Sequence, residues 1–313
     1  MKFSKPRWLI PILWVIMLCL LSSTAWAEIE LLDPVPIIGS KQLSNNNNLR
    51  SFVIENEIAF IATSNDASMQ VVDLGDPQLP ELVDEKFFSN YNTWDIALKD
   101  NYVYVANDFQ GIKIFDVKNP DNATEINSYK PVAATKQISI AINDSANLMY
   151  TGGSSSDFYV LDISNATNPV QLGSAYVEND PQAITLQGNY AYLALSSTSG
   201  FQIVDITNST NPQVLNNSTM SFADAEVNDV QVDDTGNYAF LAADNYLKVI
   251  DVSSKNSPFL DTSIFIEGAQ LQAAYLSGDD LYVIGADNIY KFDVSEPGNP
   301  VEIEHWSVKN GRD

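Results

Sequence analysis

The sequence predicts an all-β protein: a six-bladed β-propeller of four-stranded antiparallel blades, preceded by an N-terminal signal peptide. Two observations predict the propeller. An apolar run that ends in Asp returns six times, and a short run containing an aromatic residue precedes each of these Asp residues by 11 to 13 positions. Beyond residue 27, no stretch keeps a helical periodicity over ten or more residues, which argues against helical repeats.

The repeat is clearest in FYVLDISNATNPVQL at 158–172 and FQIVDITNSTNPQVL at 201–215, which stand 43 residues apart. The Asp that ends the apolar run recurs at intervals of 43, 46, 43, 46 and 42 residues, at Asp73, Asp116, Asp162, Asp205, Asp251 and Asp293. The position seven residues further on is Ala123 in the second copy and proline in the others, namely Pro80, Pro169, Pro212, Pro258 and Pro300. Self-similarity at a fixed long period is the signature of a repeat architecture.

Each repeat has the composition of four short strands. In the second repeat the strand candidates are TWDIAL, YVYVA, IKIFDV and TEINSY, separated by KDN, NDFQG and KNPDNA. The strand candidates are rich in β-branched and aromatic residues, and the breaks are rich in Asn, Asp and Gly, which suit hairpin turns. Four strands in each of six units of 42–46 residues predict a β-propeller. An open β-solenoid is the alternative, although its coils are usually shorter.

The spacing from Asp to Pro predicts turn chemistry between the third and fourth strands. The carboxylate of an Asp that ends a strand can accept backbone N–H bonds from the following turn. Proline then opens the outermost strand, an edge where its missing N–H does little harm. We therefore assign the six Asp residues a structural role. A shared metal site is the alternative, but six equivalent positions spread around a disc would not converge on one ion.

Residues 1–27 have the pattern of a secretory signal peptide. Lys2, Lys5 and Arg7 precede the apolar run Trp8–Leu21, and Ala25-Trp26-Ala27 forms a cleavage pattern. A retained membrane anchor is the alternative, but the run is shorter than the roughly 20 residues that a bilayer requires. We expect cleavage to leave one β-propeller domain over 28–313 with no membrane span, in the periplasm or outside a bacterial cell, including its surface.

The net charge excludes several classes of partner. All three charges of the predicted signal peptide are basic, so 13 Lys and Arg residues remain against 40 Asp and Glu residues, a net charge of −27. Such a chain repels nucleic acid and anionic membrane surfaces. Cys19 lies within the predicted signal peptide and is the one cysteine of the chain, so we expect a monomer stabilised by its core without disulfides.

The third-strand sequences resemble a known repeat. GIKIFDVKNP, GFQIVDITNSTNP and YLKVIDVSSKNSP are similar to the LVIVD repeat, and the resemblance covers roughly residues 29–306. It implies a β-propeller of the kind associated with exported and cell-surface bacterial proteins. It implies no particular activity, because the family carries no agreed catalytic residues.

The count of outer strands suggests how the ring closes. DPVPIIGS at 33–40 has the character of a seventh outer strand, with Pro36 in the proline position. We expect Val35–Gly39 to pair with the last blade, with Val301–Trp306 beside it or packed on the rim. Such closure would remove two exposed sheet edges.

Variation among the repeats predicts where a ligand binds. Loops that leave the outer strands share one face with loops that join second to third strands, and they differ in every repeat, whereas the turns after the six Asp residues are nearly uniform. Binding residues tend to lie on variable loops above a rigid scaffold. The candidate ligand-binding residues at the channel mouth are Tyr91, Trp94, Asp95, Glu178, Asp180, Asp224, Glu226, Asp229 and Glu267. Aromatic and acidic groups suit a sugar or a basic peptide; the alternatives are core packing for Trp94 and a solvated surface for the acids.

The sequence indicates a binding or scaffolding protein rather than an enzyme. His305 is the one histidine, so a His/Cys zinc site cannot be assembled, and a Ser-His-Asp triad would have to use this terminal residue. We predict a non-catalytic extracytoplasmic propeller that binds a protein, peptide or glycan, with no cofactor. The alternatives are a hydrolase or lactonase-type propeller with Ca²⁺ held by carboxylates in the channel, and a purely structural surface protein.

Overall fold

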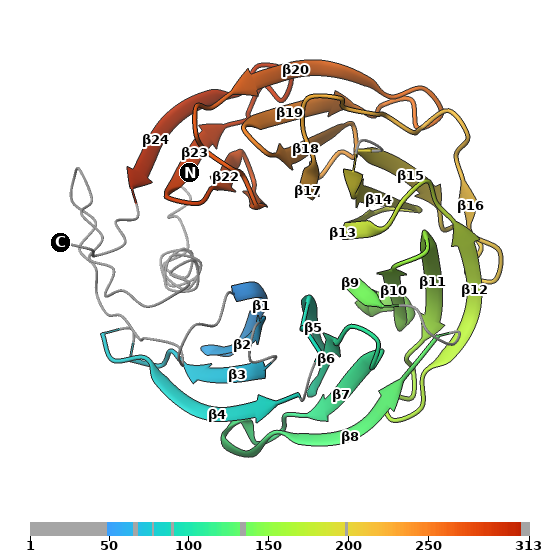
Figure 1. Ribbon diagram of the computed structural model, residues 1–313, viewed down its shortest axis with the longest axis vertical. Helices are drawn as coiled ribbons and strands as arrows, with labels where there is room; N and C mark the ends of the chain where they lie inside the picture. Colours follow the sequence, from blue (N-terminus) through green and yellow to red (C-terminus); the bar gives the residue numbers. More distant parts are fainter. Residues whose placement is uncertain are drawn as a thin grey trace, which may run out of the picture.

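The computed structural model describes residues 49–64, 68–76, 78–88, 91–131, 136–197 and 200–307. These residues form six four-stranded antiparallel sheets, which stand side by side around a common axis (Figure 1). Within each sheet the strands follow one another in chain order, from an innermost first strand to an outermost fourth strand. The predicted six-bladed propeller is confirmed.

Each blade is one contiguous stretch of chain. Blades 1 to 3 consist of β1 (Leu49–Glu55), β2 (Ile58–Thr63), β3 (Ser68–Asp73), β4 (Glu81–Phe87), β5 (Asp95–Lys99), β6 (Tyr102–Ala106), β7 (Ile112–Asp116), β8 (Thr124–Tyr129), β9 (Gln137–Asn143), β10 (Leu148–Gly153), β11 (Asp157–Asp162) and β12 (Val170–Tyr176). Blades 4 to 6 consist of β13 (Pro181–Gln187), β14 (Tyr190–Leu195), β15 (Phe201–Asp205), β16 (Gln213–Val214), β17 (Val227–Val232), β18 (Tyr238–Ala243), β19 (Tyr246–Asp251), β20 (Phe259–Phe265), β21 (Ala273–Ser277), β22 (Asp280–Ile284), β23 (Asn288–Asp293) and β24 (Val301–Ser307). Two short 3₁₀ turns, Pro120–Asn122 and Asp144–Ala146, lie in the connections.

The second and third strands of each blade form the core. Neighbouring blades cover both faces of these strands, so almost every residue along them is buried, as in β18 and β19. The recurring aromatic residue lies in the second strand, where Tyr104, Tyr192 and Phe240 are completely or almost completely buried. A strand covered on both faces carries a continuous apolar run rather than an alternating one, which explains the apolar runs that mark the repeat.

Apolar clusters join successive blades. Phe60 of blade 1 packs with Val103 of blade 2, and equivalent clusters connect each later blade to the next as far as blade 6. On the opposite face of blade 1, Ala59, Ile61 and Val72 form a further cluster. Burial of these interfaces is the main source of stability for a chain whose sequence offers no disulfide pair.

The Asp residue that ends each third strand closes the turn that follows it. In all six blades the Oδ1 atom of this residue accepts a hydrogen bond from the backbone N–H two positions later, at 2.7–3.0 Å. The turn bonds lower the pKa of Asp162, chiefly through the N–H of Ser164. The repeated proline stands immediately before the fourth strand, as Pro169 does before β12.

The fourth strand of one blade contacts the turn of the next. Asp84 in β4 accepts a hydrogen bond from Ala123 N–H in blade 2 at 2.7 Å. Asn127 and Thr262 occupy the same register position and donate to turn carbonyls of the following blades, at 2.6 and 2.7 Å. In blade 3 the position is Gly173, where a Cβ would lie 2.6 Å from a carbonyl oxygen of the turn in blade 4. These contacts fix the spacing between blades at the rim.

The sequence predicts that the last strand of the ring lies beside Val35–Gly39 or packs on the rim. Val301–Trp306 forms most of β24, the outer strand of blade 6, and pairs with β23. Trp306 stacks on Tyr282 of the same blade, with ring centroids 6.5 Å apart. The expected closing strand, Val35–Gly39, lies outside the described residues.

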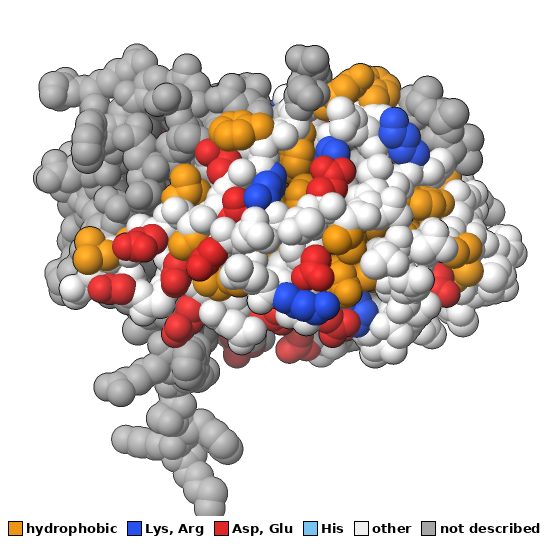
Figure 2. Space-filling model, turned by 90° about the horizontal axis from the view of Figure 1, so that it is seen from below, with side chains coloured by type: hydrophobic (Ala, Val, Ile, Leu, Met, Phe, Trp, Pro, Cys, Tyr) orange, Lys and Arg blue, Asp and Glu red, His pale blue; other side chains and the backbone are white. Residues whose placement is uncertain are grey.

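The outer surface is mixed and mainly acidic. On the side of the disc shown in Figure 2, basic side chains lie next to acidic ones. Among the ion pairs of the outer strands, Lys86 pairs with Asp84 at 2.8 Å and Lys113 of β7 pairs with Glu125 of β8 at 2.8 Å. None of the described residues belongs to a helix that is long and apolar enough to cross a bilayer.

We predict that Ala123→Pro, which restores the proline of the other repeats, lowers the free energy of unfolding by about 1 kcal/mol. Ala123 has a φ of −58°, which proline tolerates, and stiffening the unfolded chain contributes roughly 0.4–1 kcal/mol. Proline lacks the backbone N–H that donates a hydrogen bond to Asp84. A hydrogen bond to a charged group contributes about 1.5–3 kcal/mol. Urea unfolding measures the difference, with Ala123→Ser as the control that keeps the N–H. A more stable proline variant would contradict the role given to Asp84.

Candidate functional site

In four of the six blades, a residue at the start of the innermost strand stands out of register. In blades 1, 3, 4 and 5 the pairing of the first two strands shifts by one residue, and the unpaired extra residues are Arg50, Ile138, Gln182 and Asn228. Trp94 and Gln272 hold the equivalent place in blades 2 and 6, one residue before the strand, and their N–H groups donate to Ala106 and Ile284 at 2.9 and 2.7 Å. Bulges of this kind redirect side chains. We call these six residues the mouth ring.

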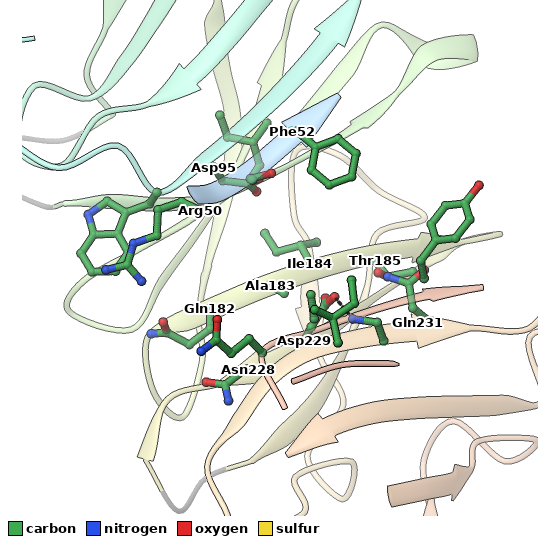
Figure 3. Close-up of a pocket in the computed structure, with 18 residues that line it drawn as sticks. Arg50, Phe52, Asp95, Gln182, Ala183, Ile184, Thr185, Asn228, Asp229 and Gln231 are labelled. Atoms are coloured by element: carbon green, nitrogen blue, oxygen red, sulfur yellow. Dashed lines mark hydrogen bonds between the residues drawn. The ribbon is translucent and has the colours of Figure 1, made fainter. Parts of the chain in front are cut away.

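Five members of the mouth ring line a cavity of about 340 Å³ whose walls come from the innermost part of all six blades, which identifies it as the central channel. Figure 3 shows Arg50, Gln182 and Asn228 toward one end of this cavity. Phe52 lies toward the other end, together with Thr185 and Gln231. Asp95 and Asp229 lie between the two ends on facing walls.

Arg50 is the one arginine among the described residues, and its guanidinium stacks on Trp94, with Cζ 4.8 Å from the ring centroid. Partial burial lowers the pKa of Arg50. Within the described ranges, no carboxylate lies within ion-pair distance of this guanidinium, whereas the buried Lys248 is paired with Asp224 at 3.0 Å. Arg50 therefore offers N–H donors to the channel without an acidic partner.

Two cationic side chains lie close to the ring of Trp94, and its indole N–H has no hydrogen-bond partner. Lys136 lies 5.9 Å from the Trp94 ring centroid, in addition to the stacked Arg50. The indole Nε1 of Trp94 is buried and has no hydrogen-bond partner. An aromatic ring close to two cations orients them electrostatically, so Trp94 positions charge at the channel mouth in addition to filling space.

Asp95 and Asp229 tie the innermost strands of adjacent blades together. One oxygen of Asp95 accepts from its neighbour Ile96 N–H at 2.8 Å and the other from Ile140 N–H in the next blade at 2.7 Å. Asp229 makes the same pair of bonds to Val230 and to Ala274 of the next blade, at 2.7 and 2.8 Å. Both residues line the channel and are partly buried.

Burial changes the titration of these two carboxyl groups. Desolvation raises the pKa of Asp95 to about 6, against the hydrogen bonds from Ser51, Ile140 and Ile96. Desolvation likewise raises the pKa of Asp229 to about 7, and repulsion from Asp95 adds to it. The channel wall therefore gains negative charge as the pH rises through the neutral range.

Other side chains satisfy further backbone groups along the innermost strands. Ser139 donates to the carbonyl of Pro181 at 3.0 Å, Thr185 donates to Val230 at 2.6 Å, and Asn228 donates to Leu271 at 2.7 Å. Each of these bonds runs from one blade to the next. The channel wall is thus held by side chains that cap the free edges of strands.

Comparison with protein families agrees with this geometry. The LVIVD repeat matches four stretches, residues 92–130, 140–176, 180–219 and 226–264, which correspond to blades 2 to 5. The chain is an LVIVD-repeat β-propeller. No curated protein matches the sequence significantly.

Solved structures resemble this LVIVD-repeat propeller in fold. A protein from Lactobacillus plantarum is 14% identical, with a TM-score of 0.73 over 86% of this chain and 88% of that one. A candidate 6-phosphogluconolactonase from Bacteroides uniformis is 12% identical, with a TM-score of 0.72 over 87% and 88%. The propeller domain of Cps50 (Swd1) from Myceliophthora thermophila is 12% identical, with a TM-score of 0.64 over 85% of each chain. At these identities the likeness establishes the fold alone.

The structure brings three of the nine predicted site residues, Trp94, Asp95 and Asp229, into the channel wall. Asp180 instead accepts a hydrogen bond from Ser156 N–H at 3.1 Å. Tyr91 makes an edge contact with Phe109, with centroids 6.3 Å apart. Asp224 pairs with Lys248, and the three remaining acids are exposed on loops outside the cavity lining: Glu178, Glu226 and Glu267.

Sequence reasoning missed four members of the mouth ring that line the cavity, namely Arg50, Gln182, Asn228 and Gln272. A signal for them exists, because each mouth-ring residue stands 10 or 12 positions before the recurring aromatic residue of its own blade. That position is occupied by Arg, Trp, Ile, Gln, Asn and Gln in chain order. The variation hides the position from a search for repeated residues.

The groups needed for a metal site do not come together. Among the described residues, no three His, Cys, Asp or Glu side chains are placed to hold a metal ion. His305 lies on the outer strand β24, where Nδ1 is 2.8 Å from Glu302 Oε1. The channel lining therefore provides hydrogen-bonding groups and one cation rather than a coordination sphere.

We predict that folding stability falls as the pH rises from about 4 to about 7. Asp95 and Asp229 have folded-state pKa values above the unfolded value of roughly 4, so the unfolded chain ionises first and stability is lost until the pH passes the folded values. For Asp229 the expected loss is on the order of 2–4 kcal/mol. Urea unfolding at pH 4.5 and pH 7.5 measures it.

The matched comparison is Asp229→Asn against Asp234→Asn, since Asp234 is exposed. Asp229→Asn should be less stable than the natural protein at pH 4.5. The carboxyl group accepts one N–H on each of its two oxygens, whereas an amide has only one oxygen that can accept. The decrease in its free energy of unfolding from pH 4.5 to pH 7.5 should be clearly smaller than in the natural protein and in Asp234→Asn. Equal pH dependence in the two variants would contradict the buried titration of Asp229.

Proposed function

We propose that this protein is a non-catalytic binding propeller that takes its ligand at the mouth of the central channel. The observation that carries the proposal is Arg50, which stacks on Trp94 and faces the cavity without a carboxylate partner in the described structure. Arg50 is exposed to solvent, so its N–H groups are accessible to a ligand. A planar guanidinium suits a ligand that carries hydrogen-bond acceptors.

The lining supports binding rather than bond cleavage. The residues that line the cavity include no histidine, cysteine or lysine. Both oxygens of Asp95 and of Asp229 already accept backbone N–H bonds that join blades. A general base needs a lone pair directed at its substrate, and each oxygen of these carboxyl groups is already oriented by a backbone N–H of the scaffold.

A calcium-assisted hydrolase is the weaker reading of the same channel. It would need several oxygen ligands converging on one ion, and the described residues provide no cluster of three acidic groups. The resemblance to a candidate 6-phosphogluconolactonase, at 12% identity, supports the propeller fold and not that activity.

The pattern of residues 1–27 supports export as part of the proposal. After cleavage the protein would act as a monomer in the periplasm, in the medium or at the cell surface, and would bind a glycan, a peptide or a protein. The strong negative charge supports the exclusion of nucleic acid as a partner.

The test is a screen of glycan and peptide arrays with the natural protein and with Gln182→Trp. Gln182 lines the cavity and makes no side-chain hydrogen bond to any other described residue, so the larger ring should fill the mouth without removing a scaffold contact. We expect binding by the natural protein and loss of at least tenfold in affinity in the variant, a difference of about 1.4 kcal/mol.

The control is Glu296→Trp, which places the same ring at an exposed position in the turn after Asp293, on the opposite face. This variant should bind like the natural protein, and both variants should melt within a few degrees of it. Binding that survives Gln182→Trp but is lost in Glu296→Trp would place the site on the face of the turns after the six Asp residues, and would contradict the proposal.

A further inference from the structure

We propose that the mouth ring recognises an acidic carbohydrate, with a sugar carboxylate on Arg50 and sugar hydroxyls on the amides of Gln182, Asn228 and Gln272. The inference rests on the proposed function, because it names the ligand of that same site. It follows from the chemistry of the ring residues and from what the channel wall leaves unsatisfied.

The geometry of Arg50 suits a carboxylate. A guanidinium that stacks on an indole by its face keeps its in-plane N–H groups free, and these match the two oxygens of a carboxylate. The contact with Trp94, with Cζ 4.8 Å from the ring centroid, holds the guanidinium at the mouth before a ligand arrives. Ordering the donor in advance reduces the entropy that binding must offset.

The three amides suit hydroxyl groups. Asn228 uses its Nδ2 to hold the carbonyl of Leu271, which leaves its amide oxygen to accept from a ligand. Gln182 and Gln272 line the cavity and carry no side-chain hydrogen bond in the described structure. Amides present a donor and an acceptor side by side, and a sugar hydroxyl both donates and accepts. In Figure 3, Gln182 and Asn228 lie at the same end of the cavity as Arg50.

The channel wall disfavours an extended peptide. A peptide gains much of its affinity for a sheet edge through backbone hydrogen bonds. Here the free edges of the innermost strands are already capped by side chains of the preceding blade: Asp95 holds Ile140 N–H, Thr185 holds the carbonyl of Val230, and further residues do the same elsewhere. A ligand in this channel would therefore be bound mainly by side chains rather than by the backbone.

The size of the site fits a sugar unit. The cavity of about 340 Å³ lies at the lower end of the roughly 300–1,000 Å³ that small-molecule sites occupy. Arg50, Gln182 and Asn228 lie at one end near the mouth, while Phe52 lies toward the other end with Thr185 and Gln231. This arrangement would admit one terminal sugar residue and leave the rest of a chain outside.

The experiment is calorimetric titration of the natural protein with oligomers of galacturonic acid and of glucuronic acid. Oligomers of galactose and glucose serve as uncharged matches, and an acidic peptide of similar length and charge serves as the competing class. We expect binding of at least one acidic sugar and at least tenfold weaker binding of its uncharged match, as for loss of a charge-assisted hydrogen bond.

Arg50→Gln should lose at least tenfold in affinity for the acidic sugar and should change affinity for the uncharged sugar little. Arg50→Lys, which keeps the charge but not the planar pair of donors, should fall between the two. Lys118→Gln is the matched control, because Lys118 is an exposed cation in the turn after Asp116, and it should bind like the natural protein. Circular dichroism melts verify that each variant is folded.

Three results would overturn the inference: no binding of either acidic sugar, equal binding of charged and uncharged sugars, or tighter binding of the acidic peptide. If Gln182→Trp abolishes binding of an array ligand but Arg50→Gln does not change it, the proposed binding function is supported and the acidic sugar is excluded as the ligand. If neither arrays nor acidic sugars reveal any ligand sensitive to Gln182→Trp, the proposed function falls as well.

Discussion

The structure depends on one constraint: the innermost strand of every blade has a neighbour on one side only. An unpaired strand edge that is shielded from bulk water must find other partners for its N–H and C=O groups. The chain meets this demand with side chains from the preceding blade, as when Asp95 accepts from Ile140 and Ser139 donates to Pro181. Each bond sets the position of the next blade, so the capping of edges and the arrangement around the axis have the same cause.

This solution places titratable groups where solvation is poor. A carboxylate is the one side chain that can accept from two N–H groups with separate oxygens, but burial disfavours its charged form. Asp95 and Asp229 thus join blades at a cost that grows with pH. The mouth-ring residue of the same blade has no such task in joining blades 2 and 3. Trp94 beside Asp95 shows the division, since Asp95 holds the next blade while Trp94 contacts the channel-facing Arg50.

The features that the sequence could predict are those that every blade shares, and the features that it could not predict are those that differ between blades. Residues that repeat because every blade needs them, such as Asp205 and the aromatic Tyr192, were visible as a period and led to the propeller. The mouth ring was not visible, because a bulge is a matter of backbone register and its residues differ from blade to blade. Asp95 and Asp229 were selected as acids near variable loops, whereas the structure gives them a scaffold role. Asp224 was selected in the same way, and Lys248 accounts for it.

Divergence within a repeated frame has its own physical meaning. The turn after each third strand keeps its Asp in all six blades, because the same backbone N–H must be satisfied there each time. At the mouth ring no backbone group requires the same side chain in every blade, and the residue type varies. The mouth ring, with one cation, one indole, one isoleucine and three amides, has no rotational symmetry. It therefore presents its one cation on one side of the axis and its amides on the other blades.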